Sequence, residues 1–222
     1  MNADQANGLA LLQLHDRRMR YSQLTMRLFV ALDLDEEIRQ RIQKFIDQVR
    51  DSAPNARWVS PESLHITLKF IGEVPDGRAE EIESALTPIT LAPFHIVVSG
   101  TGFFPTAKAA RVFWVGIDAP PVLGELATKV EDLLAIIGIP KEKRAFSPHL
   151  TVARAREASG APGWRKGNKP NRHFTKLQEH LEKSASTDFG TMTAREFFLY
   201  RSQLSSKGSR YTKIARFGLS DN

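Results

Sequence analysis

A short pattern of histidine, an apolar residue, threonine and a second apolar residue occurs twice in this chain. The two copies read His65-Ile66-Thr67-Leu68 and His149-Leu150-Thr151-Val152. Each copy lies in an apolar run typical of a β-strand, in which alternate side chains share a face. The histidine and threonine of each copy should therefore point the same way, while the apolar residues between and around them point into a core.

Two imidazoles and two hydroxyls on opposed strand faces suit proton transfer at a phosphate. Imidazole titrates near pH 6.5, so one histidine can act as a base while the other acts as an acid. Displacement at phosphorus needs both roles, and each typically contributes ~100 to 10,000-fold to the rate. Hydroxyl groups of Thr67 and Thr151 can donate hydrogen bonds to the non-bridging phosphate oxygens, where negative charge must be stabilised.

A metal site is disfavoured by the residues around both motifs. The chain has no cysteine, and no His-x-x-x-His pair or carboxylate cluster lies near either motif, whereas zinc takes three or four protein ligands. We expect His15, His173 and His180 to be solvated and His95 to be a structural residue of a strand. The sequence therefore predicts catalysis without a metal.

Arg154 and the aromatic pair Phe103 and Phe104 are further candidates for the site. In a regular strand Arg154, three residues after Thr151, lies off the catalytic face, although it could swing onto a phosphate or be a plain surface arginine. Phe104 and its neighbour could stack a base or plug an interface between lobes. The basic run from 154 to 176, which includes Trp164 and Phe174, could contact single-stranded RNA, but a solvated loop is the favoured interpretation.

The elements that must position these residues follow from apolar periodicity and turn residues. Asp35 is expected to cap the first helix. Expected helices cover 36–49, 78–87, 122–137 and 174–184; expected loops cover 72–77 and 157–172; expected strands cover 26–33, 57–59, 64–71, 94–99, 111–117, 149–154, 197–201 and 210–217.

This mixed order with short connections favours an α+β fold over a doubly wound parallel sheet. Each His-x-Thr strand lies near a long amphipathic helix, which predicts two pseudo-symmetric lobes, each with an antiparallel sheet and flanking helices, and an active-site cleft between them. We expect residues 1–25 to be a flexible N-terminal extension and residues 26–222 to form one bilobal domain. A basic insertion spans about residues 157–184.

Composition points to a globular protein with an anionic partner. The 222 residues are 41% hydrophobic, and 31 Lys and Arg against 25 Asp and Glu give a net charge of +6. No apolar run approaches the roughly 20 residues that cross a bilayer, and no signal peptide is evident. With no cysteine to form disulfides, a cytoplasmic location with no membrane association is the simplest expectation.

Longer stretches of the chain resemble the two-histidine phosphoesterases, and more narrowly the RNA 2′,3′-cyclic phosphodiesterases, also called 2′-5′ RNA ligases. The resemblance covers nearly everything after Met26. It is carried by residues 26–33, 58–73, 102–105, 111–116, 146–154 and 199–204, together with Gly208 and Tyr211.

This resemblance implies a bilobal fold with a pseudo-twofold cleft and hydrolysis of a ribose 2′,3′-cyclic phosphate to a 2′-phosphate, without cofactor or metal. It implies that His65 is the proton donor to the leaving 3′-oxygen and His149 the proton acceptor from water. Thr67, Thr151 and Arg154 would hold the phosphate. The expected substrates are RNA ends or 2′,3′-cyclic nucleotides, and we expect a monomer.

Three alternatives stay open from the sequence. The same site could join RNA through a 2′-5′ linkage, which is the reverse reaction. The chain could be a non-catalytic RNA-binding module whose histidines bind phosphate. It could also act on another cyclic sugar or nucleotide phosphate.

Overall fold

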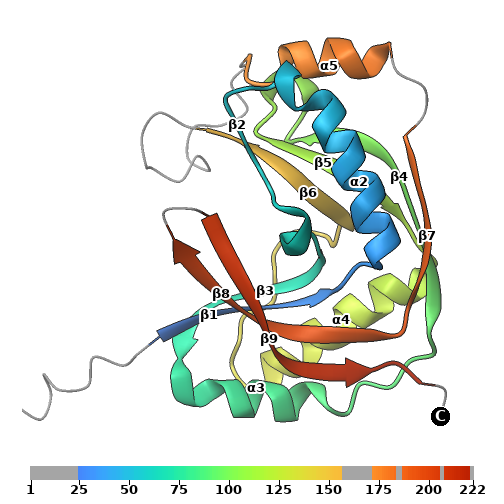
Figure 1. Cartoon of the computed structure of the whole chain (residues 1–222). Helices are drawn as coiled ribbons and strands as arrows, with labels where there is room; N and C mark the ends of the chain where they lie inside the picture. Colours follow the sequence, from blue (N-terminus) through green and yellow to red (C-terminus); the bar gives the residue numbers. More distant parts are fainter. Residues whose placement is uncertain (1–24, 157–171, 184–186, 206–207, 221–222) are drawn as a thin grey trace, which may run out of the picture.

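The computed structural model describes residues 25–156, 172–183, 187–205 and 208–220. Within them, two antiparallel sheets with flanking helices form an α+β structure, which confirms the expected fold class (Figure 1). None of the helices in these ranges is long and apolar enough to cross a membrane. The N-terminal extension and most of the basic insertion lie outside the described residues.

The four-stranded sheet has the strand order β3-β1-β8-β9. These strands are β1 (Thr25–Leu32), β3 (Ile66–Pro75), β8 (Glu196–Ser205) and β9 (Gly208–Gly218). One face packs on the main core through side chains such as Leu28, Val30 and Leu199. The other face carries its own small cluster of Phe29, Ala31, Phe198 and Tyr200. Both faces of β1 are therefore apolar at its centre.

β3 continues beyond the point where a loop was expected. The expected loop at 72–77 is wrong up to Pro75, because Val74 is buried and pairs with Met26 of β1. Gly72 has a positive φ of 90° and lies at a register shift between the two strands. A glycine at such a position marks an irregularity inside a strand as readily as the end of one.

The five-stranded sheet has the strand order β2-β6-β5-β4-β7. Its strands are β2 (Ala56–Trp58), β4 (Phe94–Phe104), β5 (Val112–Asp118), β6 (His149–Ala155) and β7 (Asp188–Ala194). The sequence did not predict β7. Its buried residues Phe189 and Met192 are three apart, because Gly190 has a φ of 104° at a register shift against β4. The period-two pattern that identifies a strand is lost there.

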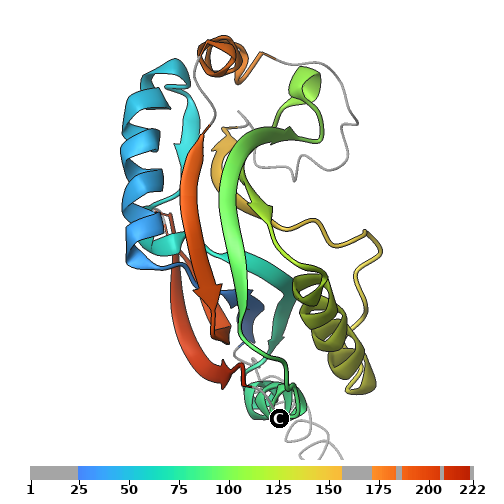
Figure 2. The same ribbon diagram turned by 90° about the vertical axis from the view of Figure 1, so that its right-hand side faces the viewer.

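Each of the two long helices follows a strand of one sheet in the sequence but packs against the other sheet. Helix α2 (Glu36–Val49) follows β1 of the four-stranded sheet but contacts β7, and α4 (Pro121–Ile136) follows β5 but contacts β3 and α3 (Ala79–Leu86) (Figures 1 and 2). The expected apolar stripe of α2 is buried. A short helix, α5 (Thr175–Glu182), confirms the helix expected near residue 180. The crossing helices tie the two sheets into one core.

Candidate active site

A β-bulge in β3 decides which side chains share the face of His65. Ala31 of β1 pairs with Thr67 and Val30 pairs with Lys69, so Leu68 has no partner of its own. Such an extra residue shifts the alternation of side chains by one. Leu68 and Lys69 are consequently both buried, and the next residue, Phe70, returns to the histidine side with 65% exposure.

A second bulge lies at the equivalent position of β6. Trp114 of β5 pairs with Thr151 and Phe113 pairs with Ala153, which leaves Val152 as the extra residue. Val152 and Ala153 are both buried, and Arg154 is exposed on the face of His149 and Thr151. The expectation that Arg154 lies off the catalytic face was based on a regular strand and is wrong for that reason.

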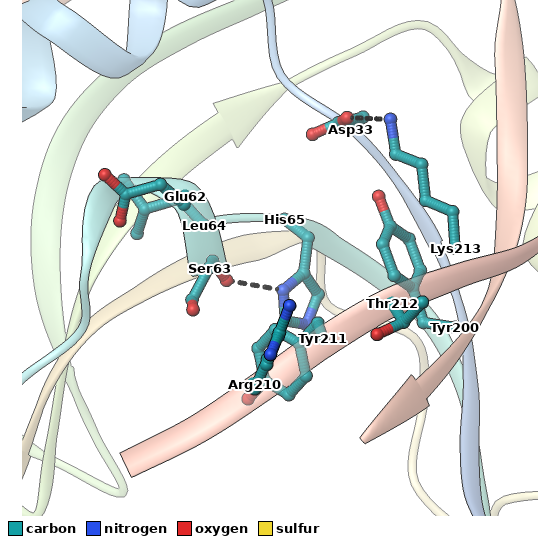
Figure 3. Close-up of a pocket in the computed structure, with 10 residues that line it drawn as sticks. All are labelled: Asp33, Glu62, Ser63, Leu64, His65, Tyr200, Arg210, Tyr211, Thr212 and Lys213. Carbon is teal, nitrogen blue, oxygen red and sulfur yellow. Dashed lines mark hydrogen bonds and ion pairs between the residues drawn. The ribbon is translucent and has the colours of Figure 1, made fainter. Parts of the chain in front are cut away.

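Both histidines are held in the same tautomer by the backbone two residues earlier. Nδ1 of His65 donates to the Ser63 carbonyl at 2.8 Å, as Figure 3 shows. Nδ1 of His149 donates to the Ser147 carbonyl at 2.7 Å. Because a carbonyl only accepts, each Nδ1 carries the proton and each Nε2 is left to exchange one with a ligand. The repeated contact confirms that the two copies are built alike.

Electrostatic interactions show that the site is assembled from both sheets. β3 and β6 contact each other although they belong to different sheets. Burial lowers the pKa of His65 to about 4, against the hydrogen bond to Ser63, and the charges of Arg39, Arg154 and His149 lower it further. Burial and the charge of Arg154 also lower the pKa of His149. The surroundings of both histidines therefore favour the neutral imidazole.

Arg39 of α2 fixes the turn that precedes His65. Its guanidinium donates to the carbonyl oxygens of Pro61 and Leu64, the latter at 3.1 Å, and pairs with Asp33. These carbonyls flank the residue that accepts the His65 hydrogen bond. Sequence reasoning gave Arg39 no role, since its apolar neighbours on α2 indicated only a core-facing helix.

Several known proteins are similar in sequence to this chain over most of its length. A family model described as LigT like Phosphoesterase matches residues 32–114. An RNA 2′,3′-cyclic phosphodiesterase of Archaeoglobus fulgidus is 34% identical over 192 residues, which cover 86% of this chain and 99% of the relative. Another with that name, from Methanothermobacter thermautotrophicus, is 32% identical over 88% of this chain and all of its own. The chain belongs to the LigT-like phosphoesterase family.

Solved structures show the same fold as this LigT-like phosphoesterase. A crystal structure of E. coli LigT complexed with 3′-AMP has a TM-score of 0.68 and 28% identity, covering 89% of this chain and all of that one. The crystal structure of a Thermus thermophilus protein, TT0787, has a TM-score of 0.69 and 28% identity, over 87% of this chain and 98% of that one.

Aromatic rings line both histidines of this LigT-like phosphoesterase. The His65 ring lies 4.7 Å from Phe29 and 5.1 Å from Tyr211, centroid to centroid. Phe104 lies edge-on to His149 at 4.9 Å. Phe103 instead stacks on the buried Phe113, so Phe104 is the member of the pair that lies beside a histidine. The sequence assigned no role to Phe29, and Tyr211 was noted only as part of the resemblance.

A cavity of about 360 Å³ opens beside His65 and is lined by groups of both charges. Figure 3 shows Tyr200 and Lys213 on one side of it and Glu62 on the other, with Lys213 paired to Asp33. Its walls come from both ends of the chain. No group of three or more His, Asp or Glu side chains in the described ranges is arranged to hold a metal.

Other aromatic and histidine residues named from the sequence lie elsewhere. Phe174 is buried against Phe103, so it is not exposed for stacking on RNA. His95 contacts Thr193 of β7, consistent with a structural role. His15 and Trp164 lie outside the described residues.

Proposed function

We propose that this chain hydrolyses the 2′,3′-cyclic phosphate of RNA ends or small nucleotides to a 2′-phosphomonoester, by acid-base catalysis without a metal. The observation that carries the proposal is the pair of histidines at contacting strands, each with Nδ1 fixed by a backbone carbonyl, so that Nε2 is the nitrogen that can exchange a proton with a ligand. The family relatives named above support the same reaction.

The proposed reaction forms one bond and breaks one at phosphorus. Nε2 of His149 takes a proton from water, whose oxygen attacks the phosphorus. Nε2 of His65 gives a proton to the 3′-oxygen as its bond to phosphorus breaks. The hydroxyls of Thr67 and Thr151 and the guanidinium of Arg154 bind the non-bridging oxygens. Phe104, beside His149, is proposed to stack the base.

His65 can act as the proton donor only if its imidazole is charged when the substrate is bound. Burial lowers the pKa of His65 to about 4, so its imidazole is neutral at pH 7. A bound phosphate anion favours the charged imidazole and must raise that pKa for His65 to donate. NMR titration of the His65 ring with and without a nucleoside 2′-monophosphate measures this. A pKa that stays near 4 in the complex would assign the donor role to His149 instead.

Incubation with 2′,3′-cyclic AMP in the presence of EDTA tests the reaction itself. Wild type should yield the 2′-monophosphate, while H65A and H149A should each lose at least about 100-fold in kcat. H95A, which removes an imidazole bonded to Thr193, is the matched control and should keep full rate. RNA that binds in a salt-sensitive way with no turnover would instead favour a binding module. A joined product from RNA with a 5′-hydroxyl end would reveal ligation.

We also propose that residues 25–222 are the functional unit and that the protein is a monomer of the cytoplasm. The first strand begins at Thr25, where it pairs with Pro75. A chain that starts at residue 25 should therefore keep the Tm and kcat of the full chain. Size-exclusion chromatography of both proteins checks the oligomeric state, and a loss of activity on truncation would give the first 24 residues a role.

A further inference from the structure

Lys69 is the only charged side chain that is fully buried in the described part of the chain. It follows Thr67 by two residues, and the bulge at Leu68 turns it to the core side of β3, away from His65. A lysine is almost never fully buried unless it is paired. Its partners therefore indicate what it does.

The ammonium group of Lys69 makes two hydrogen bonds that lead to the connection between β5 and β6. Nζ donates to Glu131 of α4 at 2.6 Å and to the carbonyl of Pro140 at 2.8 Å. The same oxygen of Glu131 accepts the backbone N–H of Glu142 at 3.1 Å. Pro140 and Glu142 lie in the segment that runs from α4 to His149. One side chain of the His65 strand thus holds the approach to the other histidine.

We propose that the Lys69–Glu131 pair is a clamp that sets the placement of the two His-x-Thr motifs relative to each other, which makes Lys69 a positioning residue of the active site. The proposal rests on the proposed function, because it concerns the same two histidines. Lys69 lies on the opposite face of β3 from His65, so it has no contact with the substrate. Its effect must pass through the backbone.

Stability alone is a poor explanation of this pair. The free-energy penalty of removing two charges from water offsets much of the attraction between them. Replacing both by apolar residues of similar size is therefore often neutral or stabilising. Removing one partner, by contrast, leaves a buried charge without compensation. A double substitution consequently separates positioning from stability, since it restores the core without restoring the link to Pro140.

The test compares K69M/E131L with a control ion pair that also involves α4. Lys141 and Asp132 also link this connection to α4, but their side chains are 59% and 52% exposed. K141M/D132L makes the matching substitutions there. With 2′,3′-cyclic AMP as substrate, K69M/E131L should lose about 10- to 100-fold in kcat, because small misplacements of reacting groups cost rates of that order. Its KM should change by less than about two-fold.

Each outcome of the comparison supports or contradicts the clamp. Wild-type kcat in K69M/E131L, or an equal loss in K141M/D132L, would overturn it. K69M alone should have a lower Tm than the double variant, because Glu131 is left unpaired. If K69M/E131L does not fold, E131Q carries the test: it keeps the shape of the site but removes the counter-charge of Lys69. A drop in kcat of about three-fold or more at unchanged KM supports the clamp, and wild-type kcat contradicts it.

A readout independent of turnover separates this proposal from the function itself. Wild type that fails to hydrolyse 2′,3′-cyclic AMP would reject the proposed function and leave the clamp open to measurement. NMR titration of the histidine rings then decides. Loss of the clamp should loosen the packing of the two strands and raise the low pKa of His65 and His149 toward 6.5 in K69M/E131L, while K141M/D132L keeps the wild-type values. Unchanged titration in K69M/E131L would contradict the clamp.

Discussion

Burial and positive charge act in the same direction on His65. Its pKa falls to about 4 in the folded chain, whereas the ordinary value near 6.5 applies once the chain unfolds. Between these two pH values the unfolded state binds a proton that the folded state does not. The free energy of unfolding therefore falls as the pH is lowered from about 6.5 to about 4.

Replacing His65 by asparagine should remove that dependence. The amide of H65N can still donate to the Ser63 carbonyl but does not titrate. Between pH 6.5 and pH 4, the free energy of unfolding of wild type should fall by at most about 3 kcal/mol relative to that of H65N. This limit follows from the size of the pKa difference. Urea unfolding at a series of pH values measures it. Parallel curves for the two proteins would show that His65 titrates normally.

Arg39 should matter to the rate because it holds the turn that precedes His65. R39M removes the donors to Pro61 and Leu64, so the turn before His65 loosens and kcat should fall about ten-fold or more. The loss of a nearby cation should also raise the pKa of His65. R41M is the control, because Arg41 pairs mainly with the exposed Glu37 on the same helix. Equal kcat in R39M and R41M would contradict this role.

At the scale of elements, alternation predicted the site well until a bulge intervened. His65 and Thr67 share a face, and so do His149 and Thr151, because a single residue of extended chain lies between the members of each pair. Arg154 was placed on the wrong face, since one extra residue at Val152 reverses the pattern and nothing in the apolar run marks it. β7 was missed for a related reason, as Gly190 breaks its alternation.

The packing of strand β4 should depend on Gly102, which lies against the indole ring of Trp114. A Cβ at Gly102 would lie 2.1 Å from the Trp114 ring, which packs on Phe104, the neighbour of His149. G102A should therefore cost about 1 to 3 kcal/mol of stability by overpacking and should also lower kcat.

A second glycine provides the matched control. A Cβ at Gly124 in α4 would meet no atom within 4 Å. G124A should stabilise the protein by about 0.5 to 1 kcal/mol, because alanine is the better helix former. Thermal unfolding of both variants measures the two effects. Equal Tm values would mean that the ring of Trp114 moves aside at little cost.

At the scale of the whole molecule, the crossing helices should make the two sheets unfold together. α2 follows one sheet and contacts the other, and α4 does the reverse. Buried side chains from both sheets also belong to one continuous main cluster. Unfolding of either sheet would therefore also expose the buried face of the other sheet to solvent.

Ring signals of the two histidines can report on the two sheets separately. His65 precedes β3 in the four-stranded sheet, and His149 begins β6 in the five-stranded sheet. In a urea series followed by NMR, both signals should disappear with the same midpoint. Two distinct midpoints would show that the lobes are independent folding units despite the crossing helices.

The four-stranded sheet draws on both ends of the chain, and this sets when the protein can work. β1 and β3 are translated before β8 and β9, which carry Tyr200 and Tyr211 beside His65. A nascent chain that has just passed residue 195 already contains both His-x-Thr motifs and lacks half of the sheet that supports one of them. Phosphodiesterase activity should consequently begin only after β8 and β9 have left the ribosome.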